Sequence, residues 1–167
     1  MLAPFIETVI HQCFLSIGNR IYPLASDKKP HDRWTVAHAL EWDCHYFISG
    51  GRAQKDLPKG IIQLTDALGF TSSLPADFGQ TITALIAYRN GMFHNGLEWP
   101  MKEREKFKRR IEEEWSSDWF IVGTSGEDPW IFYMSETFIQ HVLTWIEEVL
   151  KVLGQFVADN WPEGQTF

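Results

Sequence analysis

The stretch SETFIQHVLTWIEEVLKVLGQF, residues 135–156, decides the fold class, because its apolar residues recur every three or four positions. That spacing is the period of an α-helix with one side buried. Ser135 stands three residues before Phe138, the first apolar residue of the stretch, and suits a helix N-cap. The stretch therefore predicts a long amphipathic helix whose buried stripe consists of Phe138, Val142, Trp145, Ile146, Val149, Leu153 and Phe156.

The same spacing predicts further helices upstream. Their ends are marked by glycine, as at Gly69, or by the C-cap pair Asn95-Gly96, and proline at the first turn marks a start. Helices are expected over residues 5–17, 32–48, 61–68, 75–95 and 101–115, with the second one ending at Gly50-Gly51 and a loop over 51–58.

A minor β element is expected before the final helix. In WFIVGTSGEDPWIFYM, residues 119–134, two β-prone runs flank a Gly/Asp/Pro turn, which predicts a small hairpin or ordered loop near 119–133. The chain shows no internal repeat and no linker. The predicted architecture is all-α, a single domain over 1–167 formed by a bundle of five to six helices.

The composition places the chain among ordinary globular proteins, with 44% hydrophobic and 22% charged residues. A net charge of −7 argues against holding nucleic acid by a generally basic surface, although a local basic groove stays open. Cys13 and Cys44 lack metal-type spacing and favour a reducing compartment. The N-terminus lacks the basic region of a secretory signal, and no apolar run reaches membrane-span length, so a cytoplasmic location without membrane contact is expected.

The stretch YRNGMFHNG, Tyr88 to Gly96, carries the candidate chemistry. Asn90 and His94 are four residues apart and share one helix face, whereas Arg89 lies about 140° from His94 around the axis. The set is therefore incomplete within one helix, and it would be completed if a second copy approached the same end.

These residue types suit RNA cleavage without a metal. A histidine with an ordinary pKa of about 6.5 can transfer protons near neutral pH, and it lies here in the last helical turn. Arg89 offers a planar fork for phosphate oxygens, and Asn90 can orient the imidazole or bind a ribose hydroxyl. The alternative is that Arg89 and His94 merely suit the helix dipole and solvent, which is common for so short a motif.

The six residues RNGMFH resemble the R-N-x-x-x-H signature of the HEPN superfamily (higher eukaryote and prokaryote nucleotide-binding domains), with the match carried by Arg89, Asn90 and His94. The resemblance implies a small helical bundle that acts as a metal-independent endoribonuclease, with Arg89 and His94 catalytic and Asn90 supportive. It also implies a homodimer with a composite site, an RNA substrate, no cofactor, and a toxin or phage-defence context with an antitoxin or regulatory partner.

One position departs from part of that family. HEPN toxins controlled by a nucleotidyltransferase often carry a tyrosine two residues beyond the histidine, and this chain has Gly96 there, which argues against that mode of control. Other members serve as binding or dimerisation modules. The alternative function is therefore a non-catalytic HEPN-like module that binds a nucleotide or a protein.

Two further groups are candidate sites. A basic strip on the helix after the motif could hold an RNA backbone, or it could be a solvated face neutralised by neighbouring glutamates; it consists of Lys102, Lys106, Arg109 and Arg110. On the expected second helix, His38, Glu41 and His45 share a face at metal-ligand spacing. Because one helix alone seldom supplies a bundle metal site, ordinary polar residues are the favoured interpretation and no metal is expected.

Overall fold

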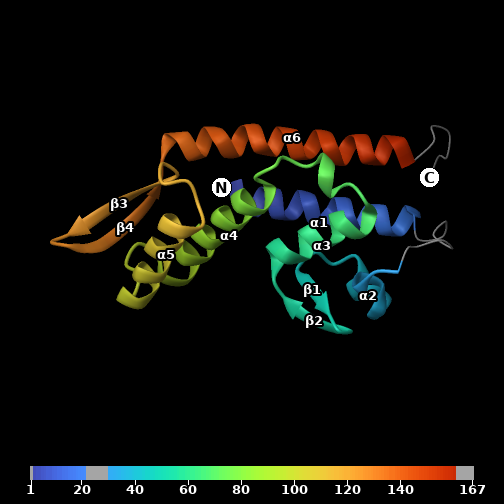
Figure 1. Ribbon diagram of the computed structural model, residues 1–167, viewed down its shortest axis with the longest axis horizontal. Helices are drawn as coiled ribbons and strands as arrows, with labels where there is room; N and C mark the ends of the chain where they lie inside the picture. The colour runs from blue at the N-terminus through green and yellow to red at the C-terminus, as the bar shows by residue number, and fades with distance from the viewer. Residues whose placement is uncertain (1, 22–29, 161–167) are drawn as a thin grey trace. The chain divides into compact units, whose positions relative to one another are not determined.

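The computed structural model describes residues 2–21 and 30–160 of the 167-residue chain (Figure 1). Six α-helices and two antiparallel hairpins make up this described part, so the mostly helical class with a minor β element is confirmed. The elements are α1 (Leu2–Ile21), η2 (Asp32–Thr35), α2 (His38–Glu41), β1 (Tyr46–Ser49), β2 (Arg52–Lys55), α3 (Leu57–Leu68), η3 (Thr71–Ser73), α4 (Phe78–Asn95), α5 (Met101–Glu113), β3 (Phe120–Ser125), β4 (Asp128–Met134) and α6 (Glu136–Asn160).

The chain divides into two compact units. The described residues within 1–76 and 148–167 form the first unit, and residues 77–147 form the second. Helix α6 contributes its last turns to the first unit and its first turns to the second. Among the described helices, none combines the length and the apolar character that crossing a lipid bilayer requires.

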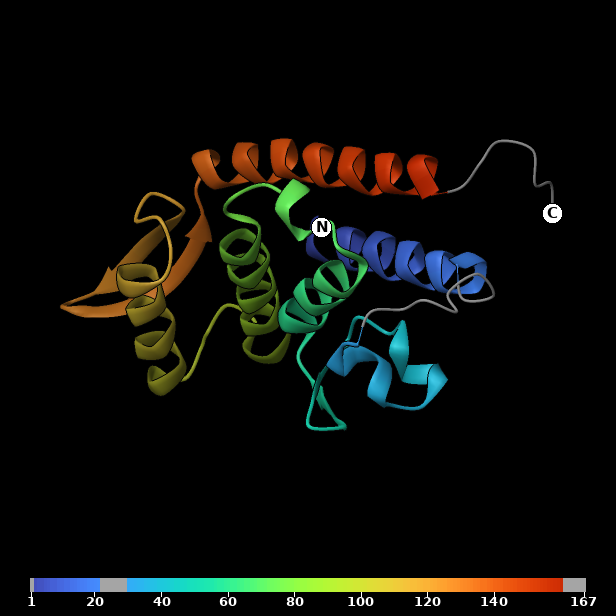
Figure 2. The same cartoon turned by 45° about the vertical axis from the view of Figure 1, so that its right-hand side comes forward.

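The predicted helix over 32–48 is wrong, and so is the predicted loop over 51–58. This region holds η2, the single-turn helix α2 and the β1–β2 hairpin that leads into α3 (Figure 2). Gly50 and Gly51 have φ values of 55° and 72°, and they connect the strands as a two-residue turn between the paired residues Ser49 and Arg52. Such a turn needs two left-handed residues and matches the twist of the strands, so Gly-Gly here begins a hairpin and does not cap a helix.

A buried arginine organises the irregular segment between α2 and β1. Arg33 is 0% exposed, and it donates hydrogen bonds to four backbone carbonyl oxygens, those of Leu40, Glu41, Asp43 and Tyr46. Its Nε lies 2.6 Å from the Glu41 oxygen. Burial lowers the pKa of Arg33 to about 10, which leaves the guanidinium charged at neutral pH. Without this side chain each of the four carbonyl groups would lose a charged donor, and the oxygens of Leu40 and Asp43 would keep only hydrogen bonds from backbone amides.

Helix α3 packs closely on the same segment. Its N-cap, Asp56, lies in the predicted loop and accepts a hydrogen bond from the Lys59 amide at 3.1 Å. Gly69 ends the helix with a φ of 80°, as the sequence predicts. The side chain of Gln63 bonds both the amide (2.8 Å) and the carbonyl (2.7 Å) of Ile48 in β1. These bonds hold α3 against the first hairpin in one register.

The second unit has an aromatic core. The Phe107 ring of α5 lies within 5.2 Å, centroid to centroid, of the rings of Trp99, Trp115, Phe120 and Phe132. Phe120 belongs to β3 and Phe132 to β4, so this cluster packs α5 on the hairpin.

The second hairpin and the final helix follow the sequence prediction. Strands β3 and β4 pair from Phe120 opposite Met134 to the turn at Gly126, which confirms the hairpin predicted near 119–133. Ser135 caps α6, because its Oγ accepts a hydrogen bond from the Phe138 amide at 3.0 Å. The predicted stripe is buried from Phe138 to Leu153 and half-buried at Phe156.

Candidate functional site

A cavity of about 520 Å³ lies between α4 and α5 in the second unit, and we call it the α4–α5 cavity. From α4 it is lined by Asn90 and His94, two of the three polar residues of the motif. From α5 it is lined by Lys106 and Arg110, which are two of the four residues of the basic strip, and by Glu103. Residues that form two separate candidates in the sequence therefore share one cavity.

The cavity owes its shape to the turn between the two helices. Trp99 is buried, and its indole Nε1 donates a hydrogen bond to the carbonyl oxygen of Gly96 at 2.9 Å. Its ring lies against Gly91, where an added Cβ would be 2.2 Å from ring atom Cη2. Glycine inside a helix costs stability relative to alanine, so its presence here is explained by the approach of the indole ring. Nothing in the motif alone indicates that Trp99 forms this wall.

We expect Gly91→Ala to destabilise the protein by about 1–3 kcal/mol, because the new methyl group would overlap the Trp99 ring. Urea denaturation followed by circular dichroism measures the change. The matched test repeats the substitution in a Trp99→Leu background, where the smaller side chain leaves room for the methyl group. The cost should then fall clearly, and an equal cost in both backgrounds would show that the contact does not matter.

The polar and charged side chains around the cavity differ in exposure and in their contacts with other side chains. Arg110 forms an ion pair with Glu114 at 2.8 Å, and its guanidinium lies 4.4 Å from the centroid of the Trp115 ring. Lys106 and His94 are exposed. The other two residues of the basic strip, Lys102 and Arg109, are exposed on α5 and do not line the cavity.

Arg89 lies outside the α4–α5 cavity. Its guanidinium carbon is 6.0 Å from the centroid of the Phe93 ring, on the neighbouring face of α4. Phe93 is 69% exposed, although its spacing places it with the buried residues Ile82, Leu85 and Ile86. Leu97, just beyond the helix, is 65% exposed. The third polar residue of the motif is thus beside an exposed apolar surface instead of beside His94.

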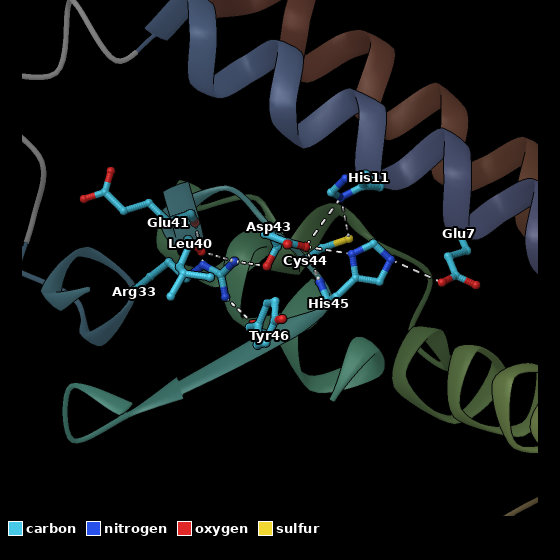
Figure 3. A network of polar contacts seen from close by, with 9 residues as sticks. All are labelled: Glu7, His11, Arg33, Leu40, Glu41, Asp43, Cys44, His45 and Tyr46. Atoms are coloured by element: carbon cyan, nitrogen blue, oxygen red, sulfur yellow. Dashed lines mark hydrogen bonds and ion pairs between the residues drawn. The ribbon is translucent and has the colours of Figure 1, made fainter. Parts of the chain in front are cut away.

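A second group of reactive side chains occurs in the first unit, and of its members the sequence pattern indicates only His45 (Figure 3). His11 from α1 meets Cys44 and His45 from the segment before β1; we call these three residues the His–Cys cluster. The set predicted on one helix face, His38, Glu41 and His45, does not exist, because α2 ends at Glu41 and His45 follows the turn after it.

The surroundings of the cluster shift two pKa values. Burial raises the pKa of the Cys44 thiol to about 12, and the neighbouring Asp43 carboxylate adds to this. For Asp43, partial burial opposes ionisation, but hydrogen bonds from the backbone and ring of His45 outweigh it and hold the pKa below its ordinary value. Both described cysteines, Cys13 and Cys44, are free thiols.

No protein-family model, curated protein or solved structure matches this chain. The likeness to the HEPN superfamily therefore remains a resemblance carried by the six residues from Arg89 to His94. Function has to be inferred from those residues and from the geometry around them.

Proposed function

We propose that this protein is a metal-independent endoribonuclease of HEPN type whose active site is the α4–α5 cavity. The observation that carries the proposal is that His94 and Asn90 of the motif share this cavity with Lys106 and Arg110. A proton-transfer group and cations that can bind phosphate are thereby placed together, which is what RNA cleavage through the 2′-hydroxyl group requires. The local basic groups also answer the objection raised by the overall negative charge.

Each residue takes one role in the proposed reaction. His94 takes the proton from the ribose 2′-hydroxyl or gives one to the leaving 5′-oxygen. The 2′-oxygen attacks the adjacent phosphorus as the bond to the 5′-oxygen breaks, so the products are a 2′,3′-cyclic phosphate and a 5′-hydroxyl. Lys106 and Arg110 hold the backbone phosphates, and Asn90 orients the imidazole or the ribose.

A second copy of the chain would supply the missing arginine. Arg89 does not line the cavity of its own chain, and it lies next to exposed Phe93 and close in sequence to exposed Leu97. An exposed apolar surface beside a cation suits a self-complementary contact between two copies. In such a homodimer Arg89 of one copy would stabilise the charge that develops at the phosphate held by its partner.

One observation favours the non-catalytic alternative. Glu103 lines the same cavity and Glu114 pairs with Arg110, so carboxylates offset part of the positive charge. A module that binds a nucleotide or a protein would need less positive charge than an enzyme that must stabilise a phosphorane-like transition state. In that case binding would persist without cleavage.

Cleavage of RNA by purified protein in magnesium-free buffer, with and without EDTA, tests the proposal. His94→Ala is expected to lower the rate by about 100-fold or more, because a positioned acid–base group typically contributes that much. Arg89→Ala should be similarly impaired. The matched controls are His38→Ala and Arg109→Ala, which change exposed residues outside the cavity and should cleave as wild type does. A His94→Ala protein that retains full activity would refute the assignment.

Mixing the two inactive variants tests the shared site. In a mixed dimer, one of the two sites combines His94 of the Arg89→Ala chain with Arg89 of the His94→Ala chain and is intact. Statistical exchange should then restore roughly a quarter of the wild-type rate. No recovery despite proven exchange would indicate that each chain uses only its own residues.

A further inference from the structure

The His–Cys cluster brings three good metal-binding atoms together from two parts of the chain. One donor atom each from His11, Cys44 and His45 lies within 4.8 Å of the other two. The Cys44 sulfur is 3.7 Å from His11 Nδ1, although the two residues are 33 positions apart. Cys44 is buried and the two histidines are half-buried, so the site would be shielded from bulk water.

Two carboxylates complete the surroundings (Figure 3). Asp43 Oδ1 lies 2.7 Å from His45 Nδ1 and 3.7 Å from His11 Nδ1, on the inner side of the cluster. Glu7 Oε1 lies 3.2 Å from His45 Nε2, on the opposite side of that ring. With Nε2 held by Glu7, loss of the Nδ1 proton to solvent would leave the Nδ1 lone pair of His45 directed toward Asp43 and the cluster. Carboxylate–histidine pairs of this kind commonly orient the ligands of a metal.

We propose that His11, Cys44 and His45 bind a divalent transition-metal ion of the zinc class, with Asp43 as the fourth ligand. Soft thiolate and imidazole donors favour such an ion over magnesium or calcium. Bonds of about 2.0–2.3 Å in a tetrahedron place donor atoms roughly 3.3–3.8 Å apart. The two separations of 3.7 Å already fit, and the shorter one, between His45 and Asp43, widens once the ion replaces the proton between them. A donor pair as far apart as 4.8 Å has to close when the ion binds.

The number and positions of the ligands indicate a structural metal site, not a catalytic one. Four protein ligands leave no open coordination position, and the ion would join α1 to the segment before β1. That segment is held from its other side, because the carbonyl oxygens of Asp43 and Tyr46 accept hydrogen bonds from Arg33. On binding, the thiol and any protonated imidazole release their protons to solvent.

The competing explanation is a network of hydrogen bonds without a metal. Protonated His45 between Asp43 and Glu7 would account for two of the short contacts. In that network the Cys44 thiol is a hydrogen-bond partner of His11 Nδ1 at 3.7 Å, whereas a zinc-class ion requires it as thiolate. The decisive experiment therefore has to report on the sulfur.

Titration of the full-length, metal-free protein with Co²⁺, followed by displacement with Zn²⁺, distinguishes the two explanations. We expect one equivalent to bind, with the ligand-field bands of tetrahedral cobalt and a thiolate-to-cobalt charge-transfer band. Cys44→Ser should abolish the charge-transfer band, and the control Cys13→Ser should keep it. Glu7→Gln should weaken affinity by about 10–100-fold, the usual effect of removing a carboxylate behind a histidine ligand.

A second variant keeps the test decisive if Cys44→Ser fails to fold. His11 is half-buried on α1, so His11→Gln removes a ligand with little disturbance of packing, and it should lower the affinity strongly even if Cys44→Ser does not fold. Absence of a charge-transfer band in wild type, or unchanged cobalt affinity in His11→Gln, would overturn the proposal. Because EDTA would also remove this ion, the RNA-cleavage assay without EDTA separates a loss of fold from a failure of the proposed nuclease.

Discussion

Arg33→Ala is expected to destabilise the protein by about 3–5 kcal/mol, the usual cost of removing one partner from a buried, charged network. The guanidinium is wholly buried and donates to the carbonyl oxygens of Leu40, Glu41, Asp43 and Tyr46. The Leu40 and Asp43 oxygens keep a hydrogen bond from a backbone amide, and a buried carbonyl left without any partner costs roughly 1–3 kcal/mol unless water can enter. Arg33→Lys should recover little, because one ammonium group cannot reproduce a planar fork that serves four acceptors.

Urea denaturation followed by far-ultraviolet circular dichroism measures the loss. The matched control is Arg52→Ala, which changes an exposed arginine in β2 and should alter stability by less than about 0.5 kcal/mol. Amide hydrogen exchange adds a local measurement, since residues 40–46 should lose protection first in Arg33→Ala. A loss of under about 1 kcal/mol would show that water replaces the side chain at these carbonyls.

The long helices could be predicted from the sequence because their signals are local. Ser135 caps α6, Gly69 ends α3 and Gly96 ends α4, and each signal depends on residues within one or two turns. The same local signals gave a wrong prediction for residues 32–48. Apolar residues there are spaced like those of a helix, but the strand preference of Tyr46 to Ile48 and the Gly50-Gly51 turn favour a hairpin. The buried Arg33 that supports this arrangement carries no local signal.

The candidate site could be predicted only in part for a related reason. The motif indicates His94 and Asn90, but their meeting with Lys106 depends on how α5 packs back against α4. The indole of Trp99 makes that packing close, and it does so by contact with a glycine that the motif leaves unspecified. Of the His–Cys cluster the sequence indicates only His45, and with the wrong companions, because His11 lies on α1 and no spacing rule connects it to Cys44.

Gly60→Ala is expected to cost about 3 kcal/mol or more, the upper end of the effect of overpacking. Gly60 lies in the first turn of α3, directly against the segment before β1. An added Cβ would be 2.2 Å from the carbonyl oxygen of Cys44 and 2.6 Å from that of Tyr46. Both neighbours are backbone atoms, so no side chain can rotate to relieve the overlap. The Tyr46 carbonyl is also held by Arg33, which restrains the segment from moving away.

The matched control for Gly60→Ala is a helix glycine at which alanine should raise the stability of the protein. Gly154 lies in α6, is exposed, and a methyl group added there would have no heavy atom of another part of the described chain within 4 Å. Gly154→Ala should therefore stabilise the protein by about 0.5–1 kcal/mol through the better helix propensity of alanine. The same denaturation curves give both values. Two helix glycines with opposite responses would show that close backbone approach keeps glycine at position 60, whereas two similar responses would mean that α3 can shift away from Cys44.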